Sequence, residues 1–279
     1  MKSRLSYEEL LDLVNKYRKE LDEKSLEMNH LKHSFLSIIS HELRTPMHAI
    51  LGFSRLLTSD ELSREEKEEY FDYINQCSNN LLNLINNLID ASLIENAELE
   101  LSQRACYPNR ILEELHEKFQ KEKHRMKKFN IALLKTSQFE DPDFKISTDQ
   151  IRLEQVLSNL LHNALKFTDK GIIEFGFFIR DDNKLQFFVT DTGKGCKRDP
   201  LLFESFYRKH DNTSDQLPGA GLGLSISHGL VKLLGGTIWV EDNDYNGSTF
   251  NFTIPMSDDS ELPSMGDNKR DNDYLHFVF

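Results

Sequence analysis

The sequence contains few cysteines, and they lie far apart. Its 279 residues include three, Cys77, Cys106 and Cys196, and no two of them have the CxxC spacing typical of zinc sites and redox motifs. A disulfide framework and a structural zinc site are therefore not expected. This pattern favours a reducing compartment such as the cytoplasm.

Long apolar runs and an excess of positive charge are also missing. No stretch approaches the roughly 20 apolar residues that a membrane-spanning helix needs, and the start of the chain is too charged for a signal peptide. The net charge of -12 argues against nonspecific binding to nucleic acid or to anionic membranes. We expect a chain that is soluble as given and cytoplasmic, with no nucleic-acid partner and no direct membrane contact.

The chain does have enough apolar residues to bury a sizeable core. Hydrophobic residues make up 38% and charged residues 29% of it, as in soluble globular proteins, and its length suits two domains. The sequence changes in character near Arg104, where a purely helical pattern gives way to alternating helix-like and strand-like segments. We therefore expect a helical domain followed by an α/β domain.

The first helical segment carries a heptad repeat that extends from Leu10 to Ile38. A stripe this narrow is typical of a two-stranded coiled coil, which needs a partner helix. The alternative is an amphipathic helix that packs on its own domain. We assign residues 1–30 to a coiled-coil signalling helix. The apolar positions of the repeat are Leu10, Val14, Tyr17, Leu21, Met28, Leu31, Phe35 and Ile38, with Lys24 as a polar break.

A second periodic run, from Tyr70 to Ala91, follows a break at residues 58–60. Two long helices with a short connection predict an antiparallel hairpin. Leu82, Ile85 and Ile89 widen the apolar face of the second helix, and a second copy of the chain would bury this surplus best. We therefore expect a homodimer in which two hairpins form a four-helix bundle, over residues 31–103.

The second part of the chain, residues 104–256, predicts a layered α/β domain. Runs rich in β-branched and aromatic residues predict strands at 131–136, 171–180, 184–191, 236–242 and 248–255. Helices are predicted at 108–127, 149–167 and 222–234, the last of them ended by two glycines. The remaining residues 257–279 are acidic and polar, and we expect them to form a flexible tail.

Three histidines lie near one face of the first helix, and periodicity alone does not rank His33, His41 and His48. His41 precedes the heptad position at Glu42, so its ring should be open to solvent, as a nucleophile requires. One ring nitrogen can attack a phosphoryl group while the other keeps a proton, which Glu42 could accept in a hydrogen bond. Pro46 leaves the Glu42 carbonyl unpaired and predicts a bend beyond His41. A solvated histidine alone usually has no role. The residues beside His41, namely Glu42, Arg44, Thr45 and Pro46, are what single it out from the other two histidines.

The string NLLHNALKFT places three polar residues on one face of a predicted helix. Asn159, Asn163 and Lys166 are spaced by four and three residues. The amide oxygen of Asn163 could bind Mg²⁺, and Lys166 could neutralise phosphate charge. An ordinary solvated helix face is the alternative when these residues are taken alone.

Two glycine-rich strings follow. In DTGKG, Asp191 ends a predicted strand, where its carboxylate could accept a hydrogen bond from the amine of adenine, and the glycines allow a tight turn. In GAGLGLSISHGL, three glycines lead into a helix whose free N–H groups could bind a phosphate. This second string lacks the P-loop pattern, and alone it is a weak signal. The glycines are Gly193 and Gly195 in the first string and Gly219, Gly221 and Gly223 in the second.

Together these strings resemble the sensor histidine kinases of two-component systems, over about residues 25–256. SHELRTP resembles the H box of that family, NLLHNALKFT its N box, DTGKG its first glycine box, FESFYR its F box and GAGLGLSIS its second glycine box. All five occur in the family's order. The resemblance implies a helical dimerisation and histidine phosphotransfer domain, followed by an ATP-binding α/β sandwich of the GHKL or Bergerat type.

The resemblance also implies roles for individual residues. His41 would accept the phosphoryl group, Glu42 would act as its orienting base, and Thr45 would help to place a water in a phosphatase reaction. Asn163 would bind the Mg²⁺ that accompanies ATP, and Asp191 would recognise adenine. The other implied nucleotide-site residues are Asn159, Lys166, Gly193, Gly195, Gly219, Gly221 and Gly223, with Phe203 and Phe206 as anchors of the lid and Thr249 beside Asp191.

The implied activity is ATP-dependent autophosphorylation of His41 and relay of the phosphoryl group to an aspartate of a response-regulator receiver domain. Response-regulator phosphatase activity is a second implied reaction. A gyrase-like or Hsp90-like ATPase is an alternative, but the H box on a dimeric hairpin argues against it. The coiled coil that begins near residue 1 predicts a longer gene product, with an upstream sensor region that could anchor it in a membrane.

The segment after DTGKG departs from the family pattern. CKRDPLL is compact and carries Cys196, Lys197 and Arg198, where the family usually has an apolar residue, a proline and a short helix. Lys194 stands where an apolar residue is common. This departure motivates a further alternative, a degenerate kinase that acts as a dimeric nucleotide-binding or scaffold protein.

Overall fold

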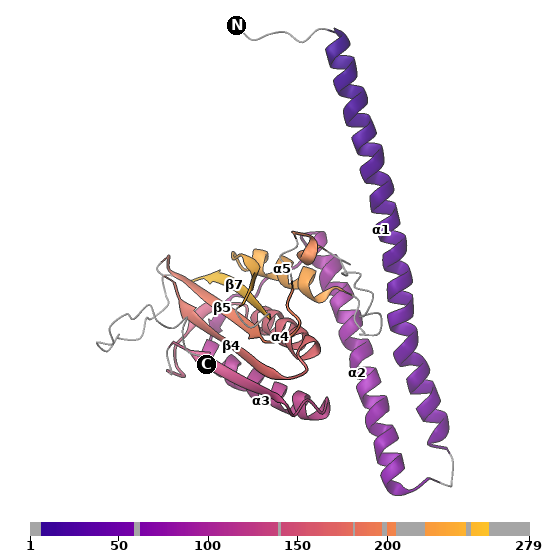
Figure 1. Ribbon diagram of the computed structural model, residues 1–279, viewed down its shortest axis with the longest axis vertical. Helices are drawn as coiled ribbons and strands as arrows, with labels where there is room; N and C mark the ends of the chain where they lie inside the picture. Colours follow the sequence, from indigo (N-terminus) through magenta and orange to yellow (C-terminus); the bar gives the residue numbers. More distant parts are fainter. Residues whose placement is uncertain are drawn as a thin grey trace, which may run out of the picture. The chain divides into compact units, whose positions relative to one another are not determined.

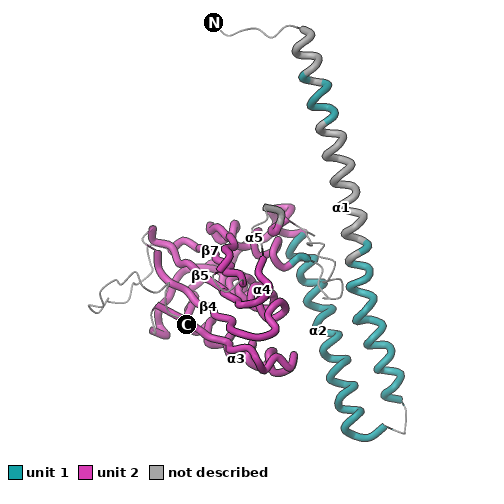
Figure 2. Tube along the Cα trace, viewed as in Figure 1, with its two compact units in different colours: residues 1–91, 205–222 teal, residues 92–204, 223–279 magenta. Residues whose placement is uncertain are grey.

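The computed structural model describes residues 7–58, 62–138, 141–180, 182–196, 200–204, 221–243 and 247–256 (Figure 1). The chain divides into two compact units, one comprising Met1–Ala91 and Ser205–Leu222, the other Ser92–Glu204 and Gly223–Phe279 (Figure 2). The predicted tail at 257–279 lies outside the described residues. No helix in the described ranges is long and apolar enough to cross a membrane.

The first unit contains a hairpin of two long helices, α1 (Tyr7–Leu56) and α2 (Arg64–Glu95), of which α2 continues into the second unit from Ser92. Helix α1 passes through Pro46 without interruption. A capping box begins α2: the Ser63 hydroxyl accepts a hydrogen bond from the Glu66 N–H, and the Glu66 carboxylate accepts one from the Ser63 N–H. The predicted hairpin is therefore confirmed.

Aromatic side chains join the two helices near their connection. The Phe53 ring on α1 lies 5.3 Å from that of Tyr70 and 5.1 Å from that of Tyr73, both on α2. Further along α2, Leu82 and Ile89 remain 57% and 51% exposed in the single chain. The hairpin therefore carries apolar surface that it does not cover itself.

The second unit is built on a five-stranded sheet in the order β2-β4-β5-β7-β6. Strand β2 runs parallel to β4, and the other neighbouring pairs are antiparallel. All five strands were predicted from the sequence. The bounds are Ile131–Ser137 for β2, Gly171–Ile179 for β4, Lys184–Asp191 for β5, Ile238–Asp242 for β6 and Ser248–Pro255 for β7.

A second sheet was not predicted. Strand β1 (Arg104–Cys106) pairs with β3 (Ile146–Thr148) in antiparallel orientation. Each strand has only three residues, which is too short for an alternating pattern to be recognised in the sequence.

Three helices, α3 (Pro108–Arg125), α4 (Gln150–Phe167) and α5 (Gly223–Leu233), lie against one face of the larger sheet (Figure 1). Their positions confirm the predicted helices to within two residues at each end. A short 3₁₀ helix, η1, spans Pro200–Phe203. The unit is thus an α/β sandwich with a single helix layer.

The core lies between this helix layer and the sheet. Alternate residues of β5 face the helices, and among them the Phe187 ring stacks 5.0 Å from that of Phe252 on β7. Burying each such side chain stabilises the fold by about 1.5–3 kcal/mol. The apolar stripe of α4 covers this face with Leu153, Val156, Leu157, Leu160, Leu161, Ala164 and Leu165, all buried.

Candidate functional site

Asp191 is the last residue of β5 and continues the buried face of the strand. Leu185, Phe187 and Val189 precede it at every second position, so its carboxylate also faces the helix layer, where Asp191 is only 5% exposed. Burial raises the pKa of this carboxyl group, and hydrogen bonds from the N–H groups of Gly193 and Ser248 partly offset that rise. The end of β5 therefore holds a hydrogen-bond acceptor that is shielded from water.

Thr168, directly after α4, forms the wall opposite this carboxylate. Its side chain is fully buried, and its hydroxyl lies close enough to lower the pKa of Asp191 somewhat. The hydroxyl nevertheless has no hydrogen bond of normal geometry within the described residues. A buried polar group without a partner is expected where a ligand completes the site. The residues here fit the amine and ring nitrogens of an adenine base.

The turn after Asp191 approaches this wall closely. A Cβ atom on Gly193 would lie 2.5 Å from the Phe167 carbonyl oxygen and 2.9 Å from the Thr168 hydroxyl oxygen. Any side chain at this position would therefore collide with the backbone that ends α4. Gly195 follows with a φ of 71°, a conformation that favours glycine.

The turn between β6 and β7 fixes the backbone of Asp191 from the other side. The Asn243 amide donates to the Asp191 carbonyl at 2.8 Å, and the Asn243 side-chain oxygen accepts from the Gly247 N–H at 2.9 Å. Asn243 thus joins the loop to the end of β5. Asn243 was not predicted as a site residue, because its role depends on a backbone contact 52 positions away.

Thr249 does not lie beside the Asp191 carboxylate, contrary to our expectation. It pairs with Thr190, and the two hydroxyl oxygens are 3.0 Å apart on the sheet face opposite to that of Asp191. Ser248 occupies the expected place: its N–H bonds to the carboxylate, and its hydroxyl accepts from the Cys196 N–H at 2.7 Å. A shift of one residue along a strand moves a side chain to the other face.

The polar face of α4 meets the start of α5. The Asn159 amide lies 3.3 Å from the Gly223 carbonyl oxygen and 3.4 Å from the Ser227 hydroxyl. Asn163 and Lys166 follow on the same face and are half-buried. Asn159 therefore connects the two helices, while the other two residues remain candidates for phosphate and metal contacts.

Any metal ion bound here would take most of its ligands from a bound nucleotide and from water. The described part of the chain has no cluster of three or more His, Cys, Asp or Glu side chains that could hold a metal. Mg²⁺ accepts an amide oxygen and takes its other ligands from phosphates and water. Asn163 fits that arrangement.

Two of the expected lid residues can be placed. The Phe203 ring on η1 lies 5.7 Å from that of His228 on α5, and Gly221 has a φ of 70°. Phe206 and Gly219 lie outside the described residues. The lid therefore stays a prediction.

The predicted phosphoacceptor lies in the other unit. His41 is exposed on α1, Glu42 is half-buried, and the Thr45 hydroxyl donates to the His41 carbonyl at 3.2 Å. A hydroxyl bonded to its own helix is easily redirected to another partner, because the donor is a rotating O–H group. His41, Glu42 and Thr45 therefore lie in one compact unit, and Asp191 and the polar face of α4 lie in the other.

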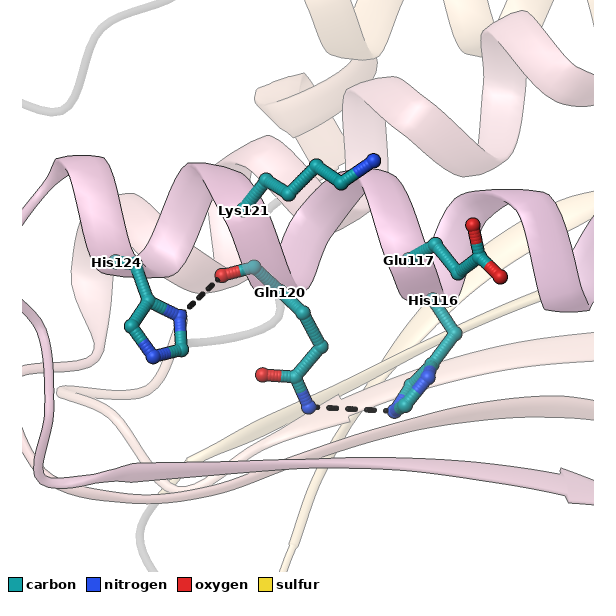
Figure 3. A pocket seen from close by; sticks show the side chains of 5 residues that line it. All are labelled: His116, Glu117, Gln120, Lys121 and His124. Atoms are coloured by element: carbon teal, nitrogen blue, oxygen red, sulfur yellow. Dashed lines mark hydrogen bonds between the residues drawn. The ribbon is translucent and has the colours of Figure 1, made fainter.

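A hollow on the surface of α3 is lined by none of the predicted site residues (Figure 3). Its side chains bond along the helix: the His124 ring to the Gln120 carbonyl, and the Gln120 amide to the His116 ring. The same nitrogen, His116 Nε2, also lies 3.2 Å from the Leu133 carbonyl oxygen; when it is protonated it donates to this carbonyl instead of accepting from Gln120, and so attaches α3 to β2. We therefore assign this hollow to helix packing rather than to catalysis.

Two family models match the chain. The His Kinase A (phospho-acceptor) domain matches residues 31–97, and the histidine kinase-, DNA gyrase B- and HSP90-like ATPase matches residues 148–258. The first range contains His41, and the second contains Asn159, Asn163 and Asp191. Each match therefore coincides with one of the two groups of site residues.

Several known proteins are similar over most of this chain. The autoinducer 2 sensor kinase/phosphatase LuxQ of Vibrio parahaemolyticus is 33% identical over 80% of this chain and 26% of its own length. The aerobic respiration control sensor protein ArcB of Escherichia coli is 34% identical over 80% of this chain and 28% of its own length. The chain thus spans about a quarter of the length of these relatives.

Solved structures show the same arrangement of elements. Full-length ShkA in complex with AMPPNP matches with a TM-score of 0.58 and 30% identity, over 80% of this chain and 45% of ShkA. The histidine kinase AdeS of Acinetobacter baumannii, at 23% identity, shares the fold with a TM-score of 0.56 over 77% of this chain and 98% of that chain. A helical hairpin and a GHKL-type sandwich, matched in this order, show that the chain belongs to the sensor histidine kinases of two-component systems and carries the catalytic core of a protein-histidine kinase.

Proposed function

We propose that this chain binds ATP in its α/β unit, transfers the γ-phosphoryl group to His41 and passes it to an aspartate of a response-regulator receiver domain. The observation that carries the proposal is the buried carboxylate of Asp191 beside the fully buried hydroxyl of Thr168. A hydrogen bond is stronger where water is excluded, so this pair suits the recognition of an adenine base. The ShkA structure, which contains AMPPNP, supports the same assignment.

The phosphates would lie along the polar face of α4 and near the start of α5. Lys166 supplies positive charge there, and the first N–H groups of α5 have no carbonyl partners within the helix. Asn163 would bind Mg²⁺ together with phosphate oxygens and water. This division, with the base at Asp191 and the phosphates at α4, matches the two ends of a nucleotide.

The transfer step needs an exposed and correctly protonated histidine. One ring nitrogen of His41 attacks the γ-phosphorus, an N–P bond forms, and the bond to the bridging oxygen breaks so that ADP leaves. The other ring nitrogen keeps its proton, held by Glu42, and the resulting phosphohistidine donates its phosphoryl group to the aspartate of the receiver domain. Such transfers depend mainly on positioning and on charge stabilisation.

We also propose that the chain acts as a homodimer. The exposed apolar residues Leu82, Ile85 and Ile89 on α2 would be buried by a second hairpin in a four-helix bundle. The division into 1–30, 31–103, 104–256 and 257–279 remains our proposal for the domains. A sensor region, with or without a membrane anchor, would act through the coiled coil of residues 1–30.

Phosphatase activity toward the response regulator is a second candidate reaction. Thr45 lies one turn beyond His41, and its hydroxyl could turn from the His41 carbonyl to a water molecule. LuxQ, which is 33% identical to this chain, is named a kinase/phosphatase. Loss of phosphate from a phosphorylated receiver domain, faster with wild-type protein than with Thr45→Ala, would support this reaction.

The kinase proposal can be tested with ATP labelled in its γ-phosphate. With Mg²⁺ present, the protein should take up label that is lost in acid and retained in alkali, as expected for phosphohistidine. His41→Gln should abolish the labelling, and the matched control His48→Gln should keep it. Label that survives His41→Gln would refute the acceptor assignment. A chain that neither binds ADP nor takes up label would instead be a degenerate kinase with a scaffold role.

A further inference from the structure

The end of α3 fixes the direction in which Lys128 points. The Lys128 N–H donates to the Lys123 carbonyl at 3.0 Å, and the Lys127 N–H donates to the His124 carbonyl at 3.0 Å. Lys127 has a φ of 57°. These are the features of a Schellman motif, in which a left-handed residue ends the helix. The motif therefore holds Lys128 rigidly at the start of the segment that leads to β2.

The side chain of Lys128 reaches the carboxyl end of α4. Its ammonium group donates to the carbonyls of Leu165 at 2.5 Å, Thr168 at 2.7 Å and Lys166 at 3.3 Å, and lies 3.5 Å from the Asp169 carboxylate. The side chain is only 17% exposed. The last carbonyls of a helix have no partners within it and carry partial negative charge. Lys128 satisfies two of them, those of Leu165 and Lys166, and also bonds to the carbonyl of Thr168 just beyond the helix.

This contact lies directly behind the base-binding wall. The Thr168 carbonyl accepts from Lys128, while the Thr168 hydroxyl lies beside Asp191. The preceding carbonyl, that of Phe167, limits how closely the Gly193 turn can approach. A displacement of the end of α4 would therefore change the distance between Thr168 and Asp191.

We infer that Lys128 is a positioning residue for adenine recognition, which it supports by holding the end of α4, and with it Thr168, against the pocket of Asp191. The inference rests on the proposed function, since it adds a residue to the same nucleotide site. Lys128 acts through Thr168 and does not itself contact the base. Removing its ammonium group should weaken the binding of adenine nucleotides while the fold is kept.

Lys123 on the same helix offers a matched control. Its ammonium group donates to the Ile131 carbonyl at 2.9 Å, and the residue is 9% exposed. Lys123 is thus also a buried lysine bonded to a backbone carbonyl, but that carbonyl belongs to β2 and not to the pocket. Lys123→Met and Lys128→Met remove the same group from two comparable sites.

The experiment measures the affinity for ADP of the full chain by calorimetry, well below the unfolding temperature of each variant. Lys128→Met should bind ADP about tenfold more weakly than the wild type, or about 1.4 kcal/mol. Its preference for ATP over GTP should fall as well, because the base end of the site is loosened. In labelling assays, KM for ATP should rise while kcat stays within about twofold, the pattern of lost uniform binding. Lys123→Met should lower the unfolding temperature but leave the affinity for ADP unchanged.

The outcomes distinguish a positioning role of Lys128 from a purely structural one. Wild-type affinity in Lys128→Met, or an equal loss in Lys123→Met, would overturn the inference and leave Lys128 with a purely structural role. Should the methionine variant fail to fold, Lys128→Gln keeps two donors and should bind ADP with intermediate affinity; wild-type affinity in that variant would also overturn the inference. Failure of the wild-type chain to bind ADP would refute the proposed function itself, and the inference with it.

Discussion

Replacing Asp191 with asparagine tests the proposed adenine site most sharply, because the two side chains have the same size but differ in charge. Burial raises the pKa of Asp191, so the folded state holds this proton more tightly than the unfolded state does. Stability therefore falls as the pH rises from the ordinary aspartate pKa to the raised one, and the cost persists at neutral pH. Asp191→Asn removes that cost. Without nucleotide, the free energy of unfolding of the variant should therefore equal or exceed that of the wild type.

Nucleotide binding should change in the opposite direction. A hydrogen bond to a charged acceptor contributes about 1.5–3 kcal/mol, so the variant should bind ADP about 10- to 150-fold more weakly. Calorimetry with ADP and urea unfolding without nucleotide measure the two effects separately. Asp143→Asn serves as the control, since the Asp143 side chain is 76% exposed. ADP affinity within about twofold of the wild type, or a marked loss of stability without nucleotide, would refute the role assigned to Asp191.

Three further predictions concern the same molecule. Asn243→Ala should weaken ADP binding about fivefold to tenfold in calorimetry, because the Asp191 carbonyl loses its clamp; unchanged affinity would contradict that role. The affinity for ADP should fall on acidification, beginning at a higher pH than an ordinary aspartate would give, and Asp191→Asn should show a smaller decline in the same titration. Ile85→Glu places a charge on the apolar face of α2, so light scattering should find a monomer where the wild type is a dimer; a variant that remains dimeric would place the interface elsewhere.

The sequence predicted most of the fold because the patterns that specify it are local. The strands of the larger sheet alternate apolar and polar residues, and α4 carries its apolar stripe at helical spacing with Asp149 as N-cap. The Asp149 carboxylate accepts from the Arg152 N–H and also from the Ser102 N–H, 47 positions away. That second bond, like the β1–β3 pair, depends on which loops meet in space. Such contacts leave no periodic signal.

The same distinction separates the predicted site residues from the missed ones. Asp191 and Gly193 could be predicted because a strand followed by a glycine turn is visible in one short string. Asn243 and Lys128 contact backbone atoms on other elements, up to 52 positions away, and the Thr168 hydroxyl lies beside a carboxylate on another element. Thr249 was placed on the wrong side of the sheet, because the register of β7 against β5 cannot be read from the string GSTF.

The most direct test of the account is to locate the phosphoryl group after incubation with Mg·ATP. Tandem mass spectrometry of peptides kept at neutral to alkaline pH, which preserves phosphohistidine, should find the added phosphoryl group on His41. The Asp191→Asn variant, incubated at low ATP, should carry much less of it. A phosphoryl group on another residue, or unmodified His41 in protein that binds ADP normally, would contradict the central claim that ATP bound at Asp191 phosphorylates His41.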